Sequence, residues 1–282
     1  MMSQALRRTR QGHPPSKRRH PNADQGARFT VPNEPLVYGV IGFILVLVLW
    51  EVVVDVGLAK ASLLSSPTRI WTAAVADFGS GVIWPQISTS LLEWIVGFVL
   101  AIVVGIPVGL ALGQVQRLEF LVEPWIYGLY ATPSVALAPL LILIFGVGVE
   151  AKFAIVFLEG VITLLISTIA GSHAADRRHM EIAQSFGASR SLTFRSVTLP
   201  SSVPFIITGL RIAAGRALVG VIVAEFIAAN VGLGFYISLN GTTLNSSRVM
   251  LGILLLGVFG IAVGQLIQRV ERRFERWRPA IH

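Results

Sequence analysis

The chain has 282 residues, of which 54% are hydrophobic and 13% charged, and its mean hydropathy is +0.71. Soluble domains carry roughly 25% charged residues, so this chain has too little polar surface to cover a water-exposed fold of its size. Lipid covers the outside of a membrane protein, and the composition therefore indicates an integral membrane protein. The sequence contains no cysteine, which excludes disulfides and thiolate metal sites.

The net charge of +8 would favour a nucleic-acid partner on a soluble surface, but the basic residues gather at the ends of apolar runs and indicate no such partner. Residues 1–35 are interpreted as a disordered basic cytoplasmic tail that contacts anionic lipid, and residues 271–282 as a second basic cytoplasmic tail. The start of the chain resembles a signal peptide with a cleavage site at 59–61. The leader is too long for one, however, and Glu51 and Asp55 interrupt it, so an uncleaved first span is favoured.

Six apolar runs are long enough to cross a membrane, which takes about 20 residues as a helix. We therefore predict an all-α membrane protein whose six transmembrane helices occupy residues 36–270. The runs cover residues 36–56, 87–113, 120–147, 151–171, 203–229 and 249–267.

The distribution of basic residues predicts the orientation of the chain. The segments 1–35, 114–119, 172–200 and 268–282 hold seven, one, four and five basic residues, or seventeen in all. The intervening loops hold four, which are Lys60, Arg69, Lys152 and Arg248. Cytoplasmic loops carry the excess of Lys and Arg, so we expect a multi-pass protein of the bacterial cytoplasmic (inner) membrane with both termini in the cytoplasm.

Prolines are expected to interrupt the third run, because Pro124, Pro133 and Pro139 each remove a backbone donor. Broken helices persist in a membrane where protein or a water-filled cavity satisfies the freed carbonyls. The break can be a simple kink against a neighbouring helix or a wall of a translocation path, and the residues leave both open. Small residues four and eight positions apart predict close helix packing in the second run: Gly97, Gly105 and Gly109.

The loop 172–200 contains signals for two short helices. Asp176 can cap a helix that ends at Gly187, since glycine adopts the left-handed conformation, and Ser189 can cap a second helix. Pro200 and Pro204 predict a bend into the fifth span.

Met180, Ala183 and Phe186 give the first of these helices an apolar stripe. Such a stripe suits docking into a groove of a partner or packing on the protein's own bundle. The residues alone leave open a docking helix or a plain interhelical linker.

The same loop resembles the EAA loop of ABC importer permeases, a Glu-x-Ala, three residues, Gly, nine residues, aliphatic-x-Leu-Pro pattern. Ile182 stands where the family pattern has its middle alanine. The resemblance implies a type I ABC importer permease fold whose cytoplasmic coupling helices, around 176–199, sit in a cleft of an ATPase. The matching residues are Glu181, Ala183, Gly187, Val197, Leu199 and Pro200.

Further segments resemble permeases for nitrate, sulfonate, taurine and bicarbonate-type solutes: 133–140, 145–148, 209–211, 224–225 and 232–234. The resemblance implies a path for a small solute such as an aliphatic sulfonate, taurine or nitrate. It also implies a homodimer with a second permease copy, two cytoplasmic ABC ATPase subunits and an extracytoplasmic substrate-binding protein. ATP and magnesium would bind to the ATPase, leaving this chain with no cofactor, no metal and no enzymatic activity.

Charged residues within the spans are the candidates for a path or gate. A central charge costs about 2.5–3.5 kcal/mol on insertion scales, so each should have a partner or face water. Three interpretations stay open: interhelical Arg–Glu pairs, a gate or cavity lining, and direct recognition of an anion by Arg211 or Arg216. Glu93 lies in the second span. The candidate path or gate residues are Pro133, Pro139, Glu159, Arg211, Arg216 and Glu225.

Two other classes of protein remain as alternatives. An ion-coupled secondary transporter would use Glu93, Glu159 or Glu225, and a membrane scaffold would have no path. No lysine follows the glycine that a Walker A loop requires, which argues against an ATPase site in this chain. His173 and His179 are interpreted as solvated loop residues.

Overall fold

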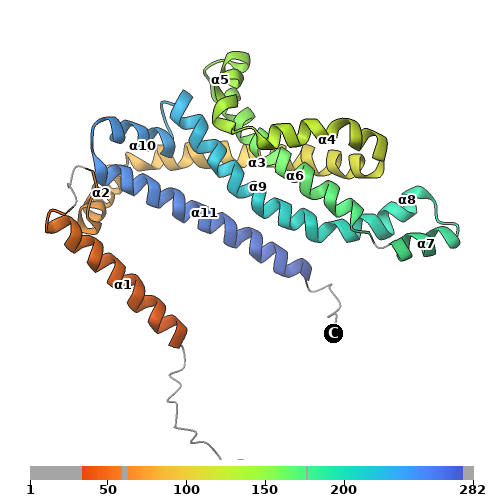
Figure 1. The fold of residues 1–282 in the computed structure, drawn as a ribbon. Helices are drawn as coiled ribbons and strands as arrows, with labels where there is room; N and C mark the ends of the chain where they lie inside the picture. Colours follow the sequence, from red (N-terminus) through yellow and green to blue (C-terminus); the bar gives the residue numbers. More distant parts are fainter. Residues whose placement is uncertain (1–33, 59–62, 176, 276–282) are drawn as a thin grey trace, which may run out of the picture. The chain divides into compact units, whose positions relative to one another are not determined.

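The computed structural model describes residues 34–58, 63–175 and 177–275, and within these ranges every regular element is a helix (Figure 1). The chain divides into two units, residues 1–46 and 47–282, which are described separately. Helix α1 (Glu34–Asp55) begins in the first unit and ends in the second. The tails at 1–33 and 276–282 and residue Asp176 lie outside the described residues, so the predictions made for them stay predictions.

The six predicted runs all form helices. Five helical segments are long and apolar enough to cross a membrane, and the bent pair α4–α5 adds a sixth if it counts as one span. The five include α1, and the others are α3 (Ile83–Gln114), α6 (Val149–His173), the stretch Arg190–Ala228 that ends in α9 (Leu199–Ala228), and α11 (Ser246–Glu275).

The third run is broken at Pro133, as predicted. Helix α4 (Gln116–Ala131) ends at Thr132, whose extended ψ of 124° is the conformation favoured before a proline. Pro133 then precedes α5 (Ser134–Phe145), which is bent by 107° from α4. Pro124 and Pro139, in contrast, lie inside these helices without ending either one.

Helices α3 and α6 pack in parallel with a constant register. A Cβ atom added at Gly97, Gly105 or Gly109 would lie within 3 Å of the side chain 59 positions later, at Val156, Leu164 and Thr168 respectively. This confirms the close packing expected from small residues and identifies its partner helix. Helices α3 and α6 cross the membrane in the same direction, so the chain must cross back between them. Helices α4 and α5 together form that span.

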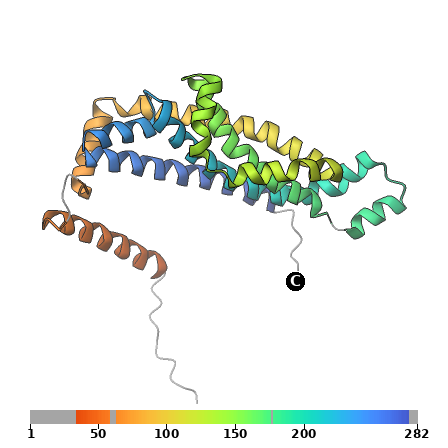
Figure 2. The ribbon, with the colours of Figure 1, turned by 45° about the horizontal axis from the view of Figure 1, so that its top comes forward.

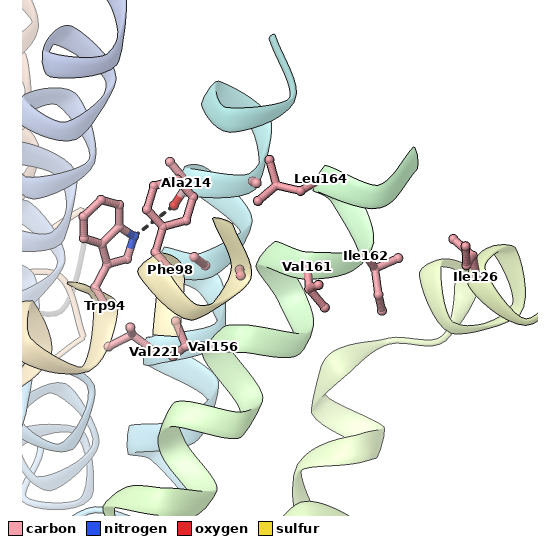
Figure 3. Close-up of a cluster of buried hydrophobic side chains, with 12 residues drawn as sticks. Trp94, Phe98, Ile126, Val156, Val161, Ile162, Leu164, Ala214 and Val221 are labelled. Carbon is pink, nitrogen blue, oxygen red and sulfur yellow. Dashed lines mark hydrogen bonds between the residues drawn. The ribbon is translucent and has the colours of Figure 1, made fainter. Parts of the chain in front are cut away.

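Helix α9 runs antiparallel to α6, since Gly209 approaches Ser167 and Gly220 approaches Val156. The apolar core lies where α3, α6 and α9 meet, with Trp94 and Phe98 of α3 stacked at 4.9 Å (Figure 3). Figure 3 also shows the Trp94 indole N–H donating to the carbonyl of Ala214 on α9, at 3.1 Å. This bond satisfies a buried donor that lipid could not.

Two short helices were not predicted from the sequence: α2 (Pro67–Gly79) and α10 (Leu233–Thr242). They lie at the end of the long helices opposite to α7 (Arg177–Ser185) and α8 (Arg190–Thr193), as Figures 1 and 2 show. Asp77 links α2 to α10 and α11. It accepts a hydrogen bond from Tyr236 Oη at 2.5 Å and two further hydrogen bonds from the guanidinium of Arg248. Burial, reinforced by that carboxylate, raises the pKa of Tyr236 far above its ordinary value, so its hydroxyl stays a donor.

Candidate coupling loop and translocation path

The first loop helix, α7, ends in a Schellman motif at Gly187. The Gly187 N–H donates to the carbonyl of Gln184 and the Ala188 N–H to that of Ala183, at 2.9 and 3.0 Å. Gly187 has φ +71°, the left-handed conformation that glycine adopts without steric cost. The predicted helix end is confirmed, and it turns the chain back toward the bundle.

The second loop helix begins where predicted, because the Ser189 hydroxyl accepts a hydrogen bond from the Leu192 N–H at 3.3 Å. The predicted bend at Pro200 and Pro204 is wrong. Helix α8 continues through a π-helical segment, η1 (Phe194–Thr198), directly into α9. Pro200 lies just after η1, whose wider i→i+5 hydrogen bonding accommodates it, and Pro204 lies inside α9, so neither proline ends the helix.

Apolar side chains at the C-terminal end of α7, including Phe186 just after it, are exposed beyond the end of the bundle. Phe186 is 86% exposed and Ile182, one turn earlier on the same face, is 53% exposed. Met180 and Ala183 are half-buried, so the predicted stripe of Met180, Ala183 and Phe186 faces partly inward. An exposed Phe–Ile pair on a helix with a fixed end is a surface that a partner can cover.

The other loop residues form the base of this surface. Glu181 is exposed on α7, and Pro200 is exposed at the start of α9. Val197 and Leu199 are half-buried where η1 joins α9. The residues singled out in the loop therefore occupy two places: the projecting helix and the helical stem that connects it to the membrane.

The most deeply buried intramembrane charge pair was not predicted. Lys152 Nζ of α6 donates to Glu93 Oε1 of α3 at 2.6 Å, and Glu93 is 0% exposed. Lys152 had been counted as a loop residue, but it lies within the first turns of α6. Lys152 follows Glu93 by 59 residues, which is the same offset that relates the glycines of α3 to their contacts on α6. The pair therefore follows from the packing of the two helices.

Glu225 is buried and caps another helix. Its Oε2 accepts from the Gly234 N–H and its Oε1 from the Ser90 hydroxyl, both at 2.6 Å. Ser90 in turn accepts from the Leu233 N–H at 2.8 Å. These are the free donors of the first turn of α10, and a carboxylate is favoured beside them. The geometry gives Glu225 a structural position, away from exposed surface.

Arg216 and Glu159 form a pair close to the middle of α9 and α6. The Arg216 Nε donates to Glu159 Oε2 at 3.1 Å, and the guanidinium lies over the ring of Tyr130, 4.9 Å from its centroid. The Glu159 side chain is 8% exposed and that of Arg216 is 37% exposed. The Arg216 guanidinium is therefore partly open, although the side chain of Arg211 is more exposed, at 46%.

Arg211 points to a different side of α9 and pairs with Glu271 near the end of α11. It lines a small cavity of about 80 Å³ with Trp94, Gly215 and Gly260. Of the six candidate path or gate residues, the structure brings together Arg216 and Glu159. Pro133 and Pro139 are exposed on the α4–α5 break.

His173 is not a simple solvated residue, contrary to the prediction. It lies in the last turn of α6, and its Nε2 is 3.0 Å from Glu119 Oε2 of α4. The two side chains line a cavity of about 250 Å³ together with Glu123 and Tyr127. Within residues 34–58, 63–175 and 177–275, no group of three or more His, Asp or Glu side chains is placed to hold a metal ion.

The fold and these sites define a polytopic helical membrane protein with paired charges inside its bundle and a helical loop projecting from one end. The profile of the binding-protein-dependent transport system inner membrane component family matches residues 101–276, and the chain belongs to this family. It is therefore a permease subunit of an ABC importer, which sets aside the secondary transporter and the scaffold.

Several curated proteins are similar over most of the chain. The taurine transport system permease protein of Escherichia coli K12 is 29% identical, covering 83% of this chain and 87% of the relative. The nitrate import permease protein of Leptolyngbya laminosa is 26% identical, covering 92% and 95%. The formylaminopyrimidine transport permease protein of Halalkalibacterium halodurans is 29% identical, covering 84% and 94%.

Solved structures agree on the fold. A chain of the inward-facing MetNI methionine ABC transporter superposes with a TM-score of 0.57 at 19% identity, covering 68% of this chain and 94% of the other. This likeness supports the type I permease fold.

Proposed function

We propose that this chain forms the translocation path of an ATP-driven importer for a small anion such as an aliphatic sulfonate, taurine or nitrate. Two relatives are named for taurine and nitrate transport, which are both solutes with an oxyanion group. A second copy of the chain would complete the path, two cytoplasmic ATPase subunits would dock below it, and a substrate-binding protein would deliver the solute outside.

The observation that carries this proposal is the exposed apolar surface of α7. Phe186 is largely exposed on the loop, and Ile182 is about half exposed beside it. Exposing large apolar side chains to water is unfavourable, and covering them against a partner recovers about 25 cal/mol per Å². The loop also carries the EAA-like residues, so an ATPase cleft is the partner we assign to it.

The path from this loop to the membrane is one continuous helical element. Helix α8 passes through η1 into α9, which carries Arg216 close to its middle. When ATP closes the ATPase dimer, movement of the docked loop would displace α9 against α6 and switch the cavity between inward-facing and outward-facing states. The permease supplies this two-state element, while ATP and magnesium stay on the ATPase.

The orientation follows from the same assignment. Docking to an ATPase places α7 and α8 in the cytoplasm together with both termini, and places α2 and α10 at the outer face. The substrate-binding protein would then approach the end of the bundle that Asp77, Tyr236 and Arg248 hold together.

A comparison of two loop variants tests the docking surface. Phe186→Asp puts a charge in the centre of the apolar face, whereas Gln184→Asp puts the same charge on α7 about 160° away around the helix. We expect the native complex, purified through the permease, to lose its ATPase subunit in Phe186→Asp and to retain it in Gln184→Asp. Stoichiometric ATPase bound to Phe186→Asp would contradict the docking surface, and a wild-type chain that purifies alone yet transports would contradict the importer itself.

A further inference from the structure

Arg216 is a half-exposed cation on an exposed, otherwise apolar face of α9. Ile212 and Val219, one turn before and after it, are exposed on the same side. A charge held toward lipid near the middle of a span costs several kcal/mol. This face of α9 therefore borders water or a second copy of the chain, and under the proposed function that water fills the translocation path.

A groove continues this face toward the loop end of α9. It has a volume of about 380 Å³ and is lined by Ser167, Pro204, Phe205 and Thr208 among others. Thr208 lies two turns before Arg216, and the two side chains leave the helix about 80° apart. The groove and the exposed cation therefore lie two turns apart on α9, whereas Lys152 and Glu225 are more deeply buried.

The guanidinium of Arg216 is held in a defined plane but is only partly engaged. Its Nε donates to Glu159, and the ring of Tyr130 supports one face. No further hydrogen bond to Arg216 occurs among the described residues, so the Nη donors are available. A planar fork of this kind pairs with two oxygens of a carboxylate, nitrate or sulfonate group, and stacking on an aromatic ring reduces the entropy lost on binding.

We infer that Arg216 is the residue that binds the oxyanion group of the solute in the path, and that Glu159 is its resting counter-ion, which the solute partly replaces. Glu159 keeps the empty site neutral, so no unpaired charge lies in the membrane between transport cycles. An anion that enters gains a charge-assisted pair with Arg216 while it competes with the carboxylate. This inference rests on the proposed function and names the specificity-determining residue of its path.

Arg211 is the matched control, because it is a second arginine of α9 that also pairs with a glutamate. The two side chains leave the helix about 140° apart, and Arg211 turns toward α11 instead of the groove. A role common to any intramembrane arginine would affect both residues equally. A role in anion binding would affect Arg216 alone.

The test measures binding of methanesulfonate and nitrate to the purified complex with its ATPase, from the shift in thermal unfolding, with neutral dimethyl sulfone as the uncharged analogue. We expect both anions, and not the sulfone, to stabilise the wild-type complex. Arg216→Gln combined with Glu159→Gln should weaken binding about tenfold or more, since a charged hydrogen bond contributes about 1.5–3 kcal/mol. This double variant leaves no unpaired charge, so it also serves if Arg216→Gln alone does not fold.

Glu159→Gln separates anion binding from a merely structural role. It removes the competing carboxylate and should tighten methanesulfonate binding, whereas loss of a structural pair would only lower the unfolding temperature. Arg211→Gln should bind as the wild type does. Unchanged binding in the double variant, equal loss in Arg211→Gln, or no stabilisation of the wild type by either anion would overturn the inference. Retention of the ATPase in all these complexes would leave the proposed function standing in each case.

Discussion

At the scale of single residues, buried charge pairs join the helices of the bundle. The sequence alone predicts few of these pairings. The sequence shows that Glu93 in the second span needs a partner, because an isolated charge there is unfavourable. It does not show that Lys152 is that partner, since a lysine near the start of a span is equally typical of a loop. Only the register between α3 and α6 brings the two side chains to 2.6 Å.

Removal of one partner should be costly. Lys152→Met leaves Glu93 buried without its cation and should lower the free energy of unfolding by about 3–5 kcal/mol, the cost of breaking buried ion pairs. Lys152→Met combined with Glu93→Leu removes both charges and should recover most of the loss. Thermal unfolding in detergent measures both variants, and equal stability of the single and double variants would argue against the pair.

Backbone conformation sets a second residue-scale constraint, at Gly187. A Cβ atom there would meet no neighbour, and the same is true of Gly215 within α9. The two positions differ in backbone angle, because Gly187 has φ +71° and Gly215 is helical. The Schellman end of α7 could be predicted from the sequence because glycine is the residue such an end requires.

Alanine substitutions separate these two effects. Gly187→Ala should cost about 1–2 kcal/mol at the end of α7 through left-handed strain, and weaken ATPase association. Gly215→Ala should be neutral or stabilising by about 0.5–1 kcal/mol, because alanine favours helix. Co-purification of the ATPase and the unfolding temperature measure both. A Gly187→Ala complex that matches the wild type in both would show that the turn is not a constraint.

At the scale of elements, the packing of α3 on α6 depends on a row of small residues. The spacing of these glycines could be predicted to form a contact face, but nothing in the spacing identifies the partner helix. The short helices α2 and α10 were missed for a different reason. Neither is long enough to span a membrane, and Asp77 and Tyr236, which fix them, are far apart in sequence.

One methyl group should disturb the α3–α6 contact. A Cβ at Gly97 would lie 2.5 Å from Val156 Cβ and 3.2 Å from the backbone nitrogen of Phe157, which cannot move aside as a flexible side chain would. We expect Gly97→Ala to destabilise the bundle by about 1–3 kcal/mol through overpacking. Gly257→Ala in α11, where a Cβ meets nothing within 4 Å, is the control. Equal unfolding temperatures for the two variants would contradict the packing.

At the scale of the whole molecule, the charge bias predicts the orientation and the parallel α3–α6 pair fixes the number of crossings. The sequence could predict six spans from hydropathy and an interruption of the third by its prolines, but not that Pro133 alone, and neither Pro124 nor Pro139, would break the helix. It could not predict that the stem of the loop continues into α9, because prolines at 200 and 204 suggest a bend. The π-helical turn η1 lies just before Pro200, and its wider i→i+5 hydrogen bonding accommodates the proline without ending the helix.

The absence of native cysteine makes the orientation directly measurable. Thr242→Cys at the end of α10 should react with a membrane-impermeant maleimide in intact spheroplasts. Ser191→Cys in α8 should react only after the membrane is opened, since the proposed function places that loop in the cytoplasm. Labelling of Ser191→Cys in intact spheroplasts would reverse the assigned orientation.

The π-helical turn η1 also sets the angular phase between the loop and α9. A π turn holds one more residue than an α turn, and each residue of an α-helix advances the direction of the side chains by about 100°. The direction in which α7 and α8 project is thus adjusted independently of the direction in which Arg216 faces. A lineage could change its fit to an ATPase by gaining or losing a single residue here, with every position of the membrane path left unchanged.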